Sequence, residues 1–272
     1  MSKYPTRREI SESDLIDLKE YSELMKELLF HRGIKTAEDA QEFLNPSYDD
    51  HVHDPFLLKD MDKAVRRVLS AIEKNEKIII YSDYDCDGIP GGVVLHDFFK
   101  KIEYKNAGNF IPHRHEDGYG FHISAIERFA RDGVDLVITV DCGITDIEAV
   151  DYANKLGIDV IITDHHLPPD DTRDLPDCLI VNPIIQNEKY PFKNLAGVGV
   201  AFKLAKAIID SSTLDKELKT RLEERVLDLV AIGTIADCMK LLGENRVLVK
   251  FINYKRVSSR KIIFLFEVFF FF

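Results

Sequence analysis

The chain has 272 residues, of which 45% are hydrophobic, and its formal net charge at pH 7 is −11. This length allows one large domain or two modest ones, and the hydrophobic content is ordinary for a globular protein. The acidic balance argues against a non-specific basic coat for nucleic acid. It does not exclude a nucleic-acid enzyme, because bound divalent cations would offset carboxylates locally.

The cysteines and the N-terminal segment favour a cytoplasmic protein. The four cysteines are widely separated, which favours reduced thiols over disulfide or zinc roles. Residues 1–20 are polar and charged and lack the apolar core of a signal peptide. No stretch approaches the length of a membrane span, so we expect no membrane contact.

Residues 1–75 are expected to form a helical region that leads into the core. Apolar residues recur at helical spacing within 21–45 and again within 61–72. His51 and His53 have a spacing that is compatible with metal binding. Because they lie in a loop rich in acids, we favour a solvated pair over a ligand pair.

The apolar run 77–81 ends in residues 83–88, Asp-Tyr-Asp-Cys-Asp-Gly. This pattern predicts a buried strand whose tip points carboxylates into a cleft before a helix begins. Pro90 is tolerated only in a first turn, so the helix should start there. Free backbone N–H groups at its N-terminus would suit a phosphate, which makes Gly91 and Gly92 candidate substrate-binding residues.

Two later strand-like runs end in the same way, at Asp141 and at Asp164-His165-His166. The alternation of strands and helices over 77–181 predicts an α/β fold with a mainly parallel sheet flanked by helices. Because ligands collect at the carboxyl ends of parallel strands, these side chains should converge. Grouped carboxylates and imidazoles need a cation to offset them, so the sequence predicts a metal centre.

The segment 110–120 carries His113, Arg114 and Tyr119 among glycines. As a loop it could present Arg114 to a phosphate and Tyr119 to a base. A polar turn with a packed tyrosine explains the same residues equally well.

The C-terminal part of the domain is expected to be helical. Residues 196–203 open a helix, and we interpret their glycines as close packing, with Lys203 and Lys206 as candidate contacts to a nucleic-acid backbone. A later, nearly uncharged segment ends at Asp237, which is a candidate fourth metal ligand. Residues 251–272 turn basic and then run into phenylalanines, an atypical tail of the kind that a truncated or frame-shifted terminus produces.

Taken together, these motifs resemble the DHH phosphoesterase superfamily and, in detail, are similar to the RecJ family of single-strand-specific exonucleases. The resemblance covers about residues 20–250 and defines a catalytic domain at 76–250. Its main motifs are residues 83–88, 141–144, 164–166 and 233–237. The RecJ-like details are Arg32-Gly33-Ile34, Asp54-Pro55-Phe56, His113-Arg114, Gly118-Tyr119-Gly120, Val181-Asn182-Pro183, residues 195–199 and residues 243–246.

The resemblance implies two divalent cations, Mn²⁺ or Mg²⁺. The implied ligands are Asp85, Asp87, Asp141, His165 and Asp237. His166 would lie against the scissile phosphate, with Arg114 stabilising the developing charge, and Asp164 would lie behind the groups that contact the metal ions. Relatives often have a histidine ligand where this chain has Tyr81, so one ion would be held by fewer protein groups.

The implied reaction is processive 5′-to-3′ release of mononucleotides from single-stranded DNA in repair and recombination. A single-strand-binding protein or a helicase would be a candidate partner. The family continues beyond this chain into a substrate-clamping domain, so we expect processivity to be impaired. Two alternatives remain at this stage: a phosphoesterase of short oligonucleotides or cyclic dinucleotides, and a non-catalytic scaffold.

Overall fold

The computed structural model describes residues 17–169 and 175–251, which fall into two compact units. The first unit ends at His51 and the second begins at Val52. The first unit contains the helices α1 (Glu23–Phe30), α2 (Ala37–Leu44) and α3 (Tyr48–His51). Helix α2 begins where the side chain of Thr36 accepts the N–H of Asp39 at 3.0 Å, which satisfies one of the helix's free donors.

The second unit is built on a parallel five-stranded sheet in the order β2-β1-β3-β4-β5. Its strands are β1 (Ile78–Ser82), β2 (Ala107–Phe110), β3 (Leu136–Val140), β4 (Asp159–Thr163) and β5 (Leu179–Val181). Strands β1, β3 and β4 are mostly buried β-branched runs, as strands covered on both faces require.

The register aligns the carboxyl ends of the central strands. Ser82 is paired with Val140, and Val140 with Thr163. Beyond these pairs, the N–H of Asp83 donates to the carbonyl of Val140 at 3.1 Å, and the N–H of Asp141 donates to the carbonyl of Thr163 at 2.9 Å. The acids that follow the strands therefore start from the same level of the sheet.

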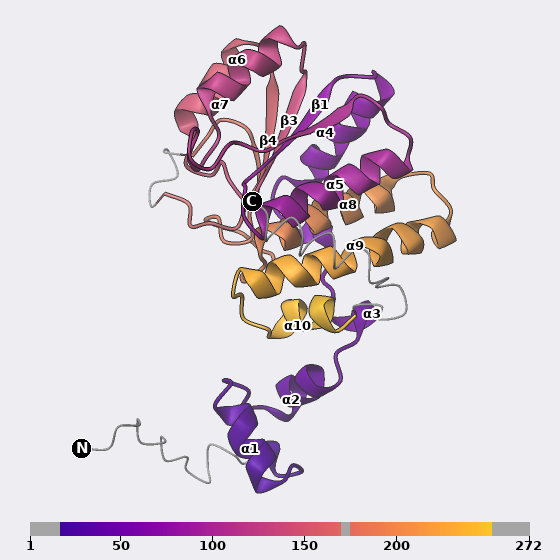
Figure 1. Ribbon diagram of the computed structural model, residues 1–272. Coiled ribbons are helices and arrows are strands. Elements are labelled where there is room, and N and C mark those ends of the chain that lie inside the picture. Colours follow the sequence, from indigo (N-terminus) through magenta and orange to yellow (C-terminus); the bar gives the residue numbers. More distant parts are fainter. Residues whose placement is uncertain (1–16, 170–174, 252–272) are drawn as a thin grey trace, which may run out of the picture. The chain divides into compact units, whose positions relative to one another are not determined.

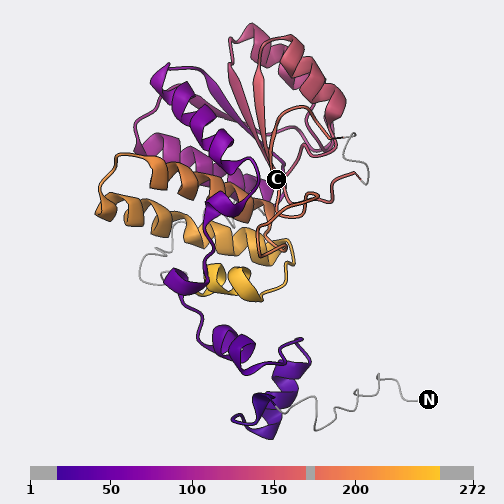
Figure 2. The ribbon, with the colours of Figure 1, turned by 180° about the vertical axis from the view of Figure 1, so that it is seen from behind.

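Helices cover both faces of the sheet (Figures 1 and 2). Helices α6 and α7 lie on one face, and α4, α5 and α8 on the other, with α9 and α10 packed outside them. The bounds are η2 (Pro55–Leu57), α4 (Met61–Glu73), α5 (Gly88–Lys101), α6 (Ile123–Arg131), α7 (Ile147–Lys155), α8 (Gly197–Ser211), α9 (Lys216–Ala236) and α10 (Gly243–Lys250). The predicted α/β class, with a helical segment after the sheet, is confirmed.

The core between the sheet and helices α6 and α7 contains Tyr81, which is fully buried. Its ring stacks on Phe110 with 5.4 Å between centroids and meets Phe121 edge-on at 5.0 Å. Its hydroxyl donates to the carbonyl of Gly120 at 2.8 Å. Tyr81 is thus a packing residue that also fixes the loop before α6.

The predicted boundary near residue 75 falls inside the second unit, because α4 packs against α8, β5 and η2. Helix α5 begins at Gly88, two residues earlier than predicted, and Pro90 still lies in its first turn. Residues 252–272 of the predicted tail lie outside the described residues. None of the described helices is both long enough and apolar enough to cross a bilayer.

Candidate metal centre and active site

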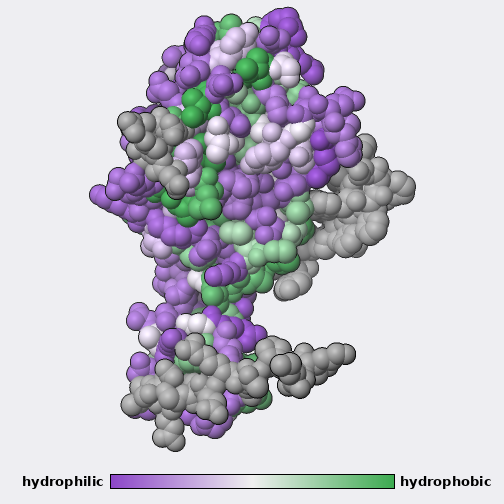
Figure 3. All heavy atoms as spheres, turned by 90° about the vertical axis from the view of Figure 1, so that its left-hand side faces the viewer, coloured by the Kyte–Doolittle hydropathy of each residue, from purple (hydrophilic) through white to green (hydrophobic). Residues whose placement is uncertain are grey.

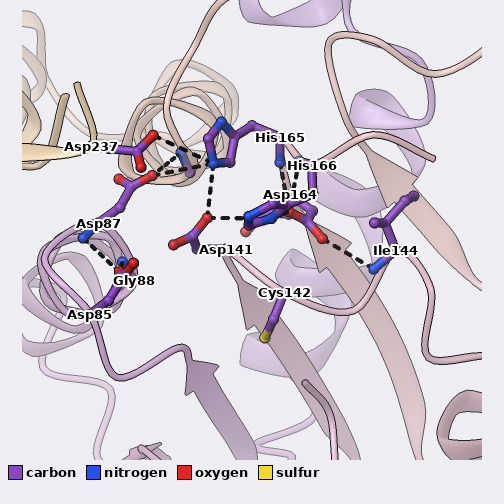
Figure 4. Close-up of polar contacts among 12 residues, drawn as sticks. Asp85, Asp87, Gly88, Asp141, Cys142, Ile144, Asp164, His165, His166 and Asp237 are labelled. Atoms are coloured by element: carbon purple, nitrogen blue, oxygen red, sulfur yellow. Dashed lines mark hydrogen bonds and ion pairs between the residues drawn. The ribbon is translucent and has the colours of Figure 1, made fainter. Parts of the chain in front are cut away.

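The imidazole of His165 is surrounded by carboxylates from three different elements (Figure 4). Its Nε2 lies 3.2 Å from Oδ1 of Asp141, 3.6 Å from Oδ2 of Asp87 and 3.7 Å from Oδ2 of Asp237. Asp141 follows β3, whereas Asp87 precedes α5 and Asp237 ends α9. The structure therefore brings together four of the five predicted ligands around one nitrogen atom.

Asp87 is held by the first turn of α8. It is fully buried, and its two carboxylate oxygens accept the N–H groups of Gly197 at 2.5 Å and of Val198 at 2.8 Å. A helix N-terminus favours a negative charge at this place. Burial nevertheless raises the pKa of Asp87 to about 6, although the two amides and His165 oppose that change.

Two glycines make the close approach of α8 and α9 possible. A Cβ atom on Gly197 would lie 2.6 Å from both Cβ and Oδ1 of Asp141, and one on Gly233 would lie 2.7 Å from Cγ1 of Val198. Sequence reasoning assigned the glycines of residues 196–203 to packing and missed what they pack against. Glycine is unfavourable inside a helix, so its presence in α8 and α9 was the available signal for a close approach.

Asp141 has a strained backbone and an unsatisfied carboxylate. Its φ is +63°, a left-handed conformation that is uncommon outside glycine. Its Oδ1 is buried and accepts no hydrogen bond from any described residue. Burial, followed by the charges of Asp87 and Asp85, raises the pKa of Asp141 to about 10. A buried carboxylate oxygen that accepts no hydrogen bond, among other acids and beside an imidazole, indicates a place for a cation.

Asp164 faces His166 rather than the carboxylates around His165. It is fully buried, and its Oδ1 accepts Nδ1–H of His166 at 2.7 Å while its Oδ2 accepts the N–H of Ile144 at 3.1 Å. Burial raises its pKa, but the bonds from His166 and the backbone outweigh that effect, so its pKa is lowered overall. The same contact raises the pKa of His166. The contact therefore favours the ionised form of Asp164 and the protonated form of His166.

Residues 77–234 match the family described as DHH family, N-terminal domain. The chain belongs to the DHH family.

Among curated relatives, this DHH chain is 43% identical over 226 residues to the single-stranded-DNA-specific exonuclease RecJ of Bacillus subtilis, covering 83% of this chain and 27% of that protein. It is 34% identical over 249 residues to RecJ of Escherichia coli, covering 89% of this chain and 41% of that protein. The DHH chain thus spans less than half the length of either relative.

Solved structures of RecJ share the fold of this DHH chain. A structure of exonuclease RecJ bound to manganese superposes with a TM-score of 0.63 and 34% identity, covering 72% of this chain and 47% of that one. RecJ from Thermus thermophilus in complex with Mn²⁺ gives a TM-score of 0.65 with 30% identity, covering 82% of this chain and 30% of that one.

Tyr119 and His166 lie together at the mouth of the DHH site. The Tyr119 hydroxyl is 3.1 Å from Nδ1 of His166 and 3.3 Å from the carbonyl oxygen of Asp141. Both side chains are about half exposed, at 49% for the Tyr119 residue and 45% for the His166 side chain. The predicted contact of Tyr119 with a base remains a prediction, and the structure adds that Tyr119 also orients His166.

Arg114 and His113 lie on the surface of the DHH domain. The Arg114 guanidinium stacks over the ring of Tyr84 at 4.2 Å, and the ring of His113 lies 6.0 Å from that of His115. In the described part of the chain, no hydrogen bond or ion pair joins Arg114 or His113 to the carboxylates around His165. Their predicted substrate contacts therefore remain predictions.

The prediction of free N–H groups at the start of α5 is wrong. Oδ1 of Asp85 accepts the N–H groups of Asp87 at 2.8 Å and Gly88 at 2.9 Å, and the N–H of Gly91 donates to the Asp87 carbonyl at 3.1 Å. A Cβ on Gly91 would lie 2.6 Å from Val140 Cγ1, and one on Gly92 would collide with Ser82. These two glycines are packing residues, and Asp85 caps the helix.

The two lysines of α8 are engaged within the protein. Lys203 is fully buried, forms an ion pair with Glu244 and donates to the carbonyl of His53 at 2.7 Å. Lys206 lies 3.1 Å from Glu223 and 3.2 Å from Asp210. The proposed contact of Lys203 with a nucleic-acid backbone is therefore wrong, whereas that of Lys206, whose side chain is partly exposed, remains a prediction.

The donor set of the DHH site fits hard divalent cations. Carboxylate oxygens with one or two imidazoles suit Mn²⁺ or Mg²⁺, and no cysteine belongs to a candidate ligand group among the described residues. Within the described residues, three overlapping groups each bring their ligand atoms within 4.8 Å of one another. They are Asp141-His165-His166, Asp87-His165-Asp237 and Asp83-Asp85-Asp141.

Proposed function

We propose that this chain is the catalytic domain of a metal-dependent 5′-to-3′ exonuclease that hydrolyses phosphodiester bonds of single-stranded DNA in repair and recombination. The observation that carries the proposal is the position of His165 Nε2 among the carboxylates of Asp87, Asp141 and Asp237. The similarity to RecJ exonucleases, whose structures contain Mn²⁺ or Mg²⁺, supports it.

Two divalent cations, Mn²⁺ or Mg²⁺, are the proposed cofactors. Asp87, His165 and Asp237 would hold one ion, and Asp85 would belong to the second. Asp141, whose Oδ1 is buried and unsatisfied, lies where it can serve both. Bound together, two such ions lower the pKa of a nearby water and stabilise charge on a phosphodiester.

The other residues at the mouth would bind and orient the strand. The hydrogen bond to Asp164 raises the pKa of His166, which favours the imidazolium form that would stabilise negative charge on the scissile phosphate. Arg114 presents a planar guanidinium that is suited to a second phosphate, and Tyr119 offers a half-exposed ring to a base. Leu167, next to His166, is 80% exposed and adds apolar surface for a base.

The face in Figure 3 is mostly hydrophilic, with apolar side chains in small groups. We propose single-stranded DNA as the partner, exposed by a helicase or delivered by a single-strand-binding protein in the cytoplasm.

The test is Mn²⁺-dependent release of mononucleotides from 5′-labelled single-stranded DNA by the full 272-residue chain. Asp141→Ala should abolish the release, whereas Asp151→Ala, at an exposed position of α7, should leave it unchanged. Double-stranded DNA of the same sequence should resist degradation.

Three results would contradict the proposal. Release that does not depend on Asp141 would place the chemistry elsewhere. Faster hydrolysis of dinucleotides or cyclic dinucleotides than of long strands would indicate a small-substrate phosphoesterase. Binding of Mn²⁺ and DNA without any hydrolysis would indicate a scaffold.

A further inference from the structure

A pocket of about 490 Å³ lies at the end of α5 that is farther from the metal centre. Helix α5 begins at Gly88, beside Asp85 and Asp87 (Figure 4), and ends at Lys101. Its 14 residues span about 20 Å, at about 1.5 Å per residue, so the pocket is remote from the carboxylates around His165. Its volume lies within the range of about 300–1,000 Å³ that is typical of small-molecule sites. The pocket is lined by His96, Phe99, Lys100, Glu103, Tyr104, Lys105 and Ala107.

Two of the lining side chains are lysines without a partner. Lys100 and Lys105 are exposed, and neither ammonium group forms an ion pair or a hydrogen bond within the described ranges. By contrast, Lys203 and Lys206 each reach a carboxylate. Because the chain carries a net charge of −11, two unpaired ammonium groups at one pocket are unexpected. They give the pocket a positive potential that attracts an anion.

Aromatic rings form the apolar part of the pocket. Phe99 is buried, and its ring centroid lies 5.8 Å from that of Tyr104. The Tyr104 hydroxyl donates to the carbonyl of Glu76 and lies 3.2 Å from that of Ala71, so this ring is held in place. Rings that are already fixed can pack against a planar group of a ligand without a further loss of side-chain freedom.

Glu103 has a backbone conformation that favours glycine. Its φ is +60° at the end of α5, where its N–H donates to the carbonyl of Lys100 at 3.2 Å and the N–H of Tyr104 donates to that of Phe99 at 2.9 Å. Glycine is usual at this position of a helix end, because a Cβ is unfavourable there. The turn also satisfies two carbonyls that would otherwise repel an anion. A glutamate that costs stability here and lines a pocket indicates a role other than folding.

His96 contributes a polar atom that has no partner in the folded chain. Its Nδ1 is buried, and no described residue forms a hydrogen bond with it. Burying a polar atom without a partner is unfavourable, so packing alone would favour an apolar side chain at this position. In the wall of a pocket, a ligand can supply the missing hydrogen bond.

We propose that this pocket binds a small molecule that joins a phosphate to an aromatic ring, and that a deoxynucleoside 5′-monophosphate is this ligand. Lys100 and Lys105 would hold the phosphate, and the base would pack against Phe99 and Tyr104. The Glu103 carboxylate would accept a hydrogen bond from the sugar or the base. The choice of a nucleotide rests on the proposed function, since mononucleotides are the products of that reaction, whereas the pocket itself does not depend on it.

The first experiment titrates dAMP into the full 272-residue chain by calorimetry in EDTA, which keeps divalent cations away from the carboxylates. One molecule should bind. Deoxyadenosine and inorganic phosphate each offer half of the ligand and should bind at least about tenfold more weakly. Equal affinity for dAMP and either half would overturn the assignment of a nucleotide, and no binding of dAMP would overturn the site.

Lys105→Ala should weaken dAMP binding by at least about tenfold, because it removes a charged contact with the phosphate. The matched control is Lys101→Ala, which removes an exposed lysine from the same end of α5 that does not line the pocket. This control should bind dAMP as the wild type does. Equal losses in the two variants would reduce the effect to general positive charge and overturn the assignment.

Glu103→Gly separates ligand binding from folding. It should raise the melting temperature of the free protein, because glycine adopts a φ of +60° without strain, and it should still weaken dAMP binding. A more stable variant that binds dAMP as tightly as the wild type would overturn the role of Glu103.

Imidazole NMR distinguishes this pocket from the metal centre. Adding dAMP to the metal-free protein should shift the signals of His96, assigned with His96→Gln, and leave those of His165 and His166 in place. Shifts at His165 and His166 without a shift at His96 would overturn the pocket and leave the exonuclease proposal intact. A chain that binds dAMP at His96 but releases no mononucleotides from single-stranded DNA would support the pocket and contradict the proposed function.

Discussion

The N–H of Gly197 donates to Oδ2 of Asp87 at 2.5 Å, so the first turn of α8 holds a candidate metal ligand. The same glycine leaves the space that the side chain of Asp141 occupies. One helix terminus therefore fixes two carboxylates that come from different strand ends. The geometry of the centre depends on where α8 begins as much as on the acids themselves.

Gly197→Ala is expected to weaken Mn²⁺ binding by at least about tenfold, because the new Cβ would lie 2.6 Å from Oδ1 of Asp141 and must displace it. The control is Gly199→Ala in the same helix, whose Cβ would meet only the side chain of Leu195, at 3.3 Å. Calorimetric titration with Mn²⁺ measures both variants. Equal affinities for the two would contradict the role assigned to Gly197.

Asp164→Asn is expected to lower the pKa of His166, because the hydrogen bond from His166 to the Asp164 carboxylate is the main cause of its increase. Nitrogen-15 NMR of the metal-free protein can follow the titration of the imidazole directly. Hydrolysis should fall by about 10- to 100-fold, and its decline at high pH should begin at lower pH. An unchanged His166 titration would show that Asp164 does not control the imidazole.

Metal binding is expected to release protons. In the metal-free protein the pKa of Asp141 is about 10, so at pH 7 this carboxyl is protonated and a cation must displace the proton. Mn²⁺ affinity should rise about tenfold per pH unit near neutrality, as linkage to one proton requires. Calorimetry in two buffers of different ionisation enthalpy counts the protons. Asp141→Asn is the control, and it should release fewer protons for each Mn²⁺ ion that it still binds.

Lys203→Met is expected to cost about 3–5 kcal/mol in the free energy of unfolding, because it leaves Glu244 buried without its counter-ion. Glu244 would retain the Tyr190 hydroxyl, which donates to it at 2.6 Å. The control Lys63→Met breaks an exposed pair with Asp60 and should leave the free energy of unfolding nearly unchanged. Urea unfolding measures both, and similar small losses would show that the buried pair contributes little.

The sheet and the convergence of its tips could be predicted because their signals are local. An apolar β-branched run followed by acids identifies each strand end, and parallel topology then brings Asp87, Asp141 and His165 together wherever the intervening helices lie. Asp237 could be predicted as well, because it is a single acid at the end of a nearly uncharged segment, and the structure places it within 3.7 Å of His165.

The remaining features depend on contacts between residues that are distant in sequence. Lys203 lies on a helix and could be solvated or buried, and only its pairing with Glu244, in another helix, decides which. The amides that hold Asp87 belong to residues 110 and 111 positions later in the chain. Likewise, the carboxylate of Asp85 accepts the backbone N–H groups at the start of α5. The glycine-rich sequence suggested that these N–H groups were free, but the helix is capped. Periodicity identifies a buried face, but it does not say which polar groups find partners there.

Arg114→Ala is expected to weaken single-stranded DNA binding by about tenfold and to reduce the salt dependence of binding by about one counter-ion, as loss of one phosphate contact requires. The side chain is exposed and stacked over Tyr84 at 4.2 Å, so its removal should leave Mn²⁺ binding unchanged. The control is Arg128→Ala on α6, whose guanidinium lies over Phe110 at 5.7 Å. Binding is measured by fluorescence anisotropy with a labelled strand and Ca²⁺ in place of Mn²⁺, which separates binding from hydrolysis. Equal losses for both arginines would mean that Arg114 contributes only general positive charge. A loss confined to Arg114 would place the path of the strand over the ring of Tyr84, beside the carboxylates that follow β1.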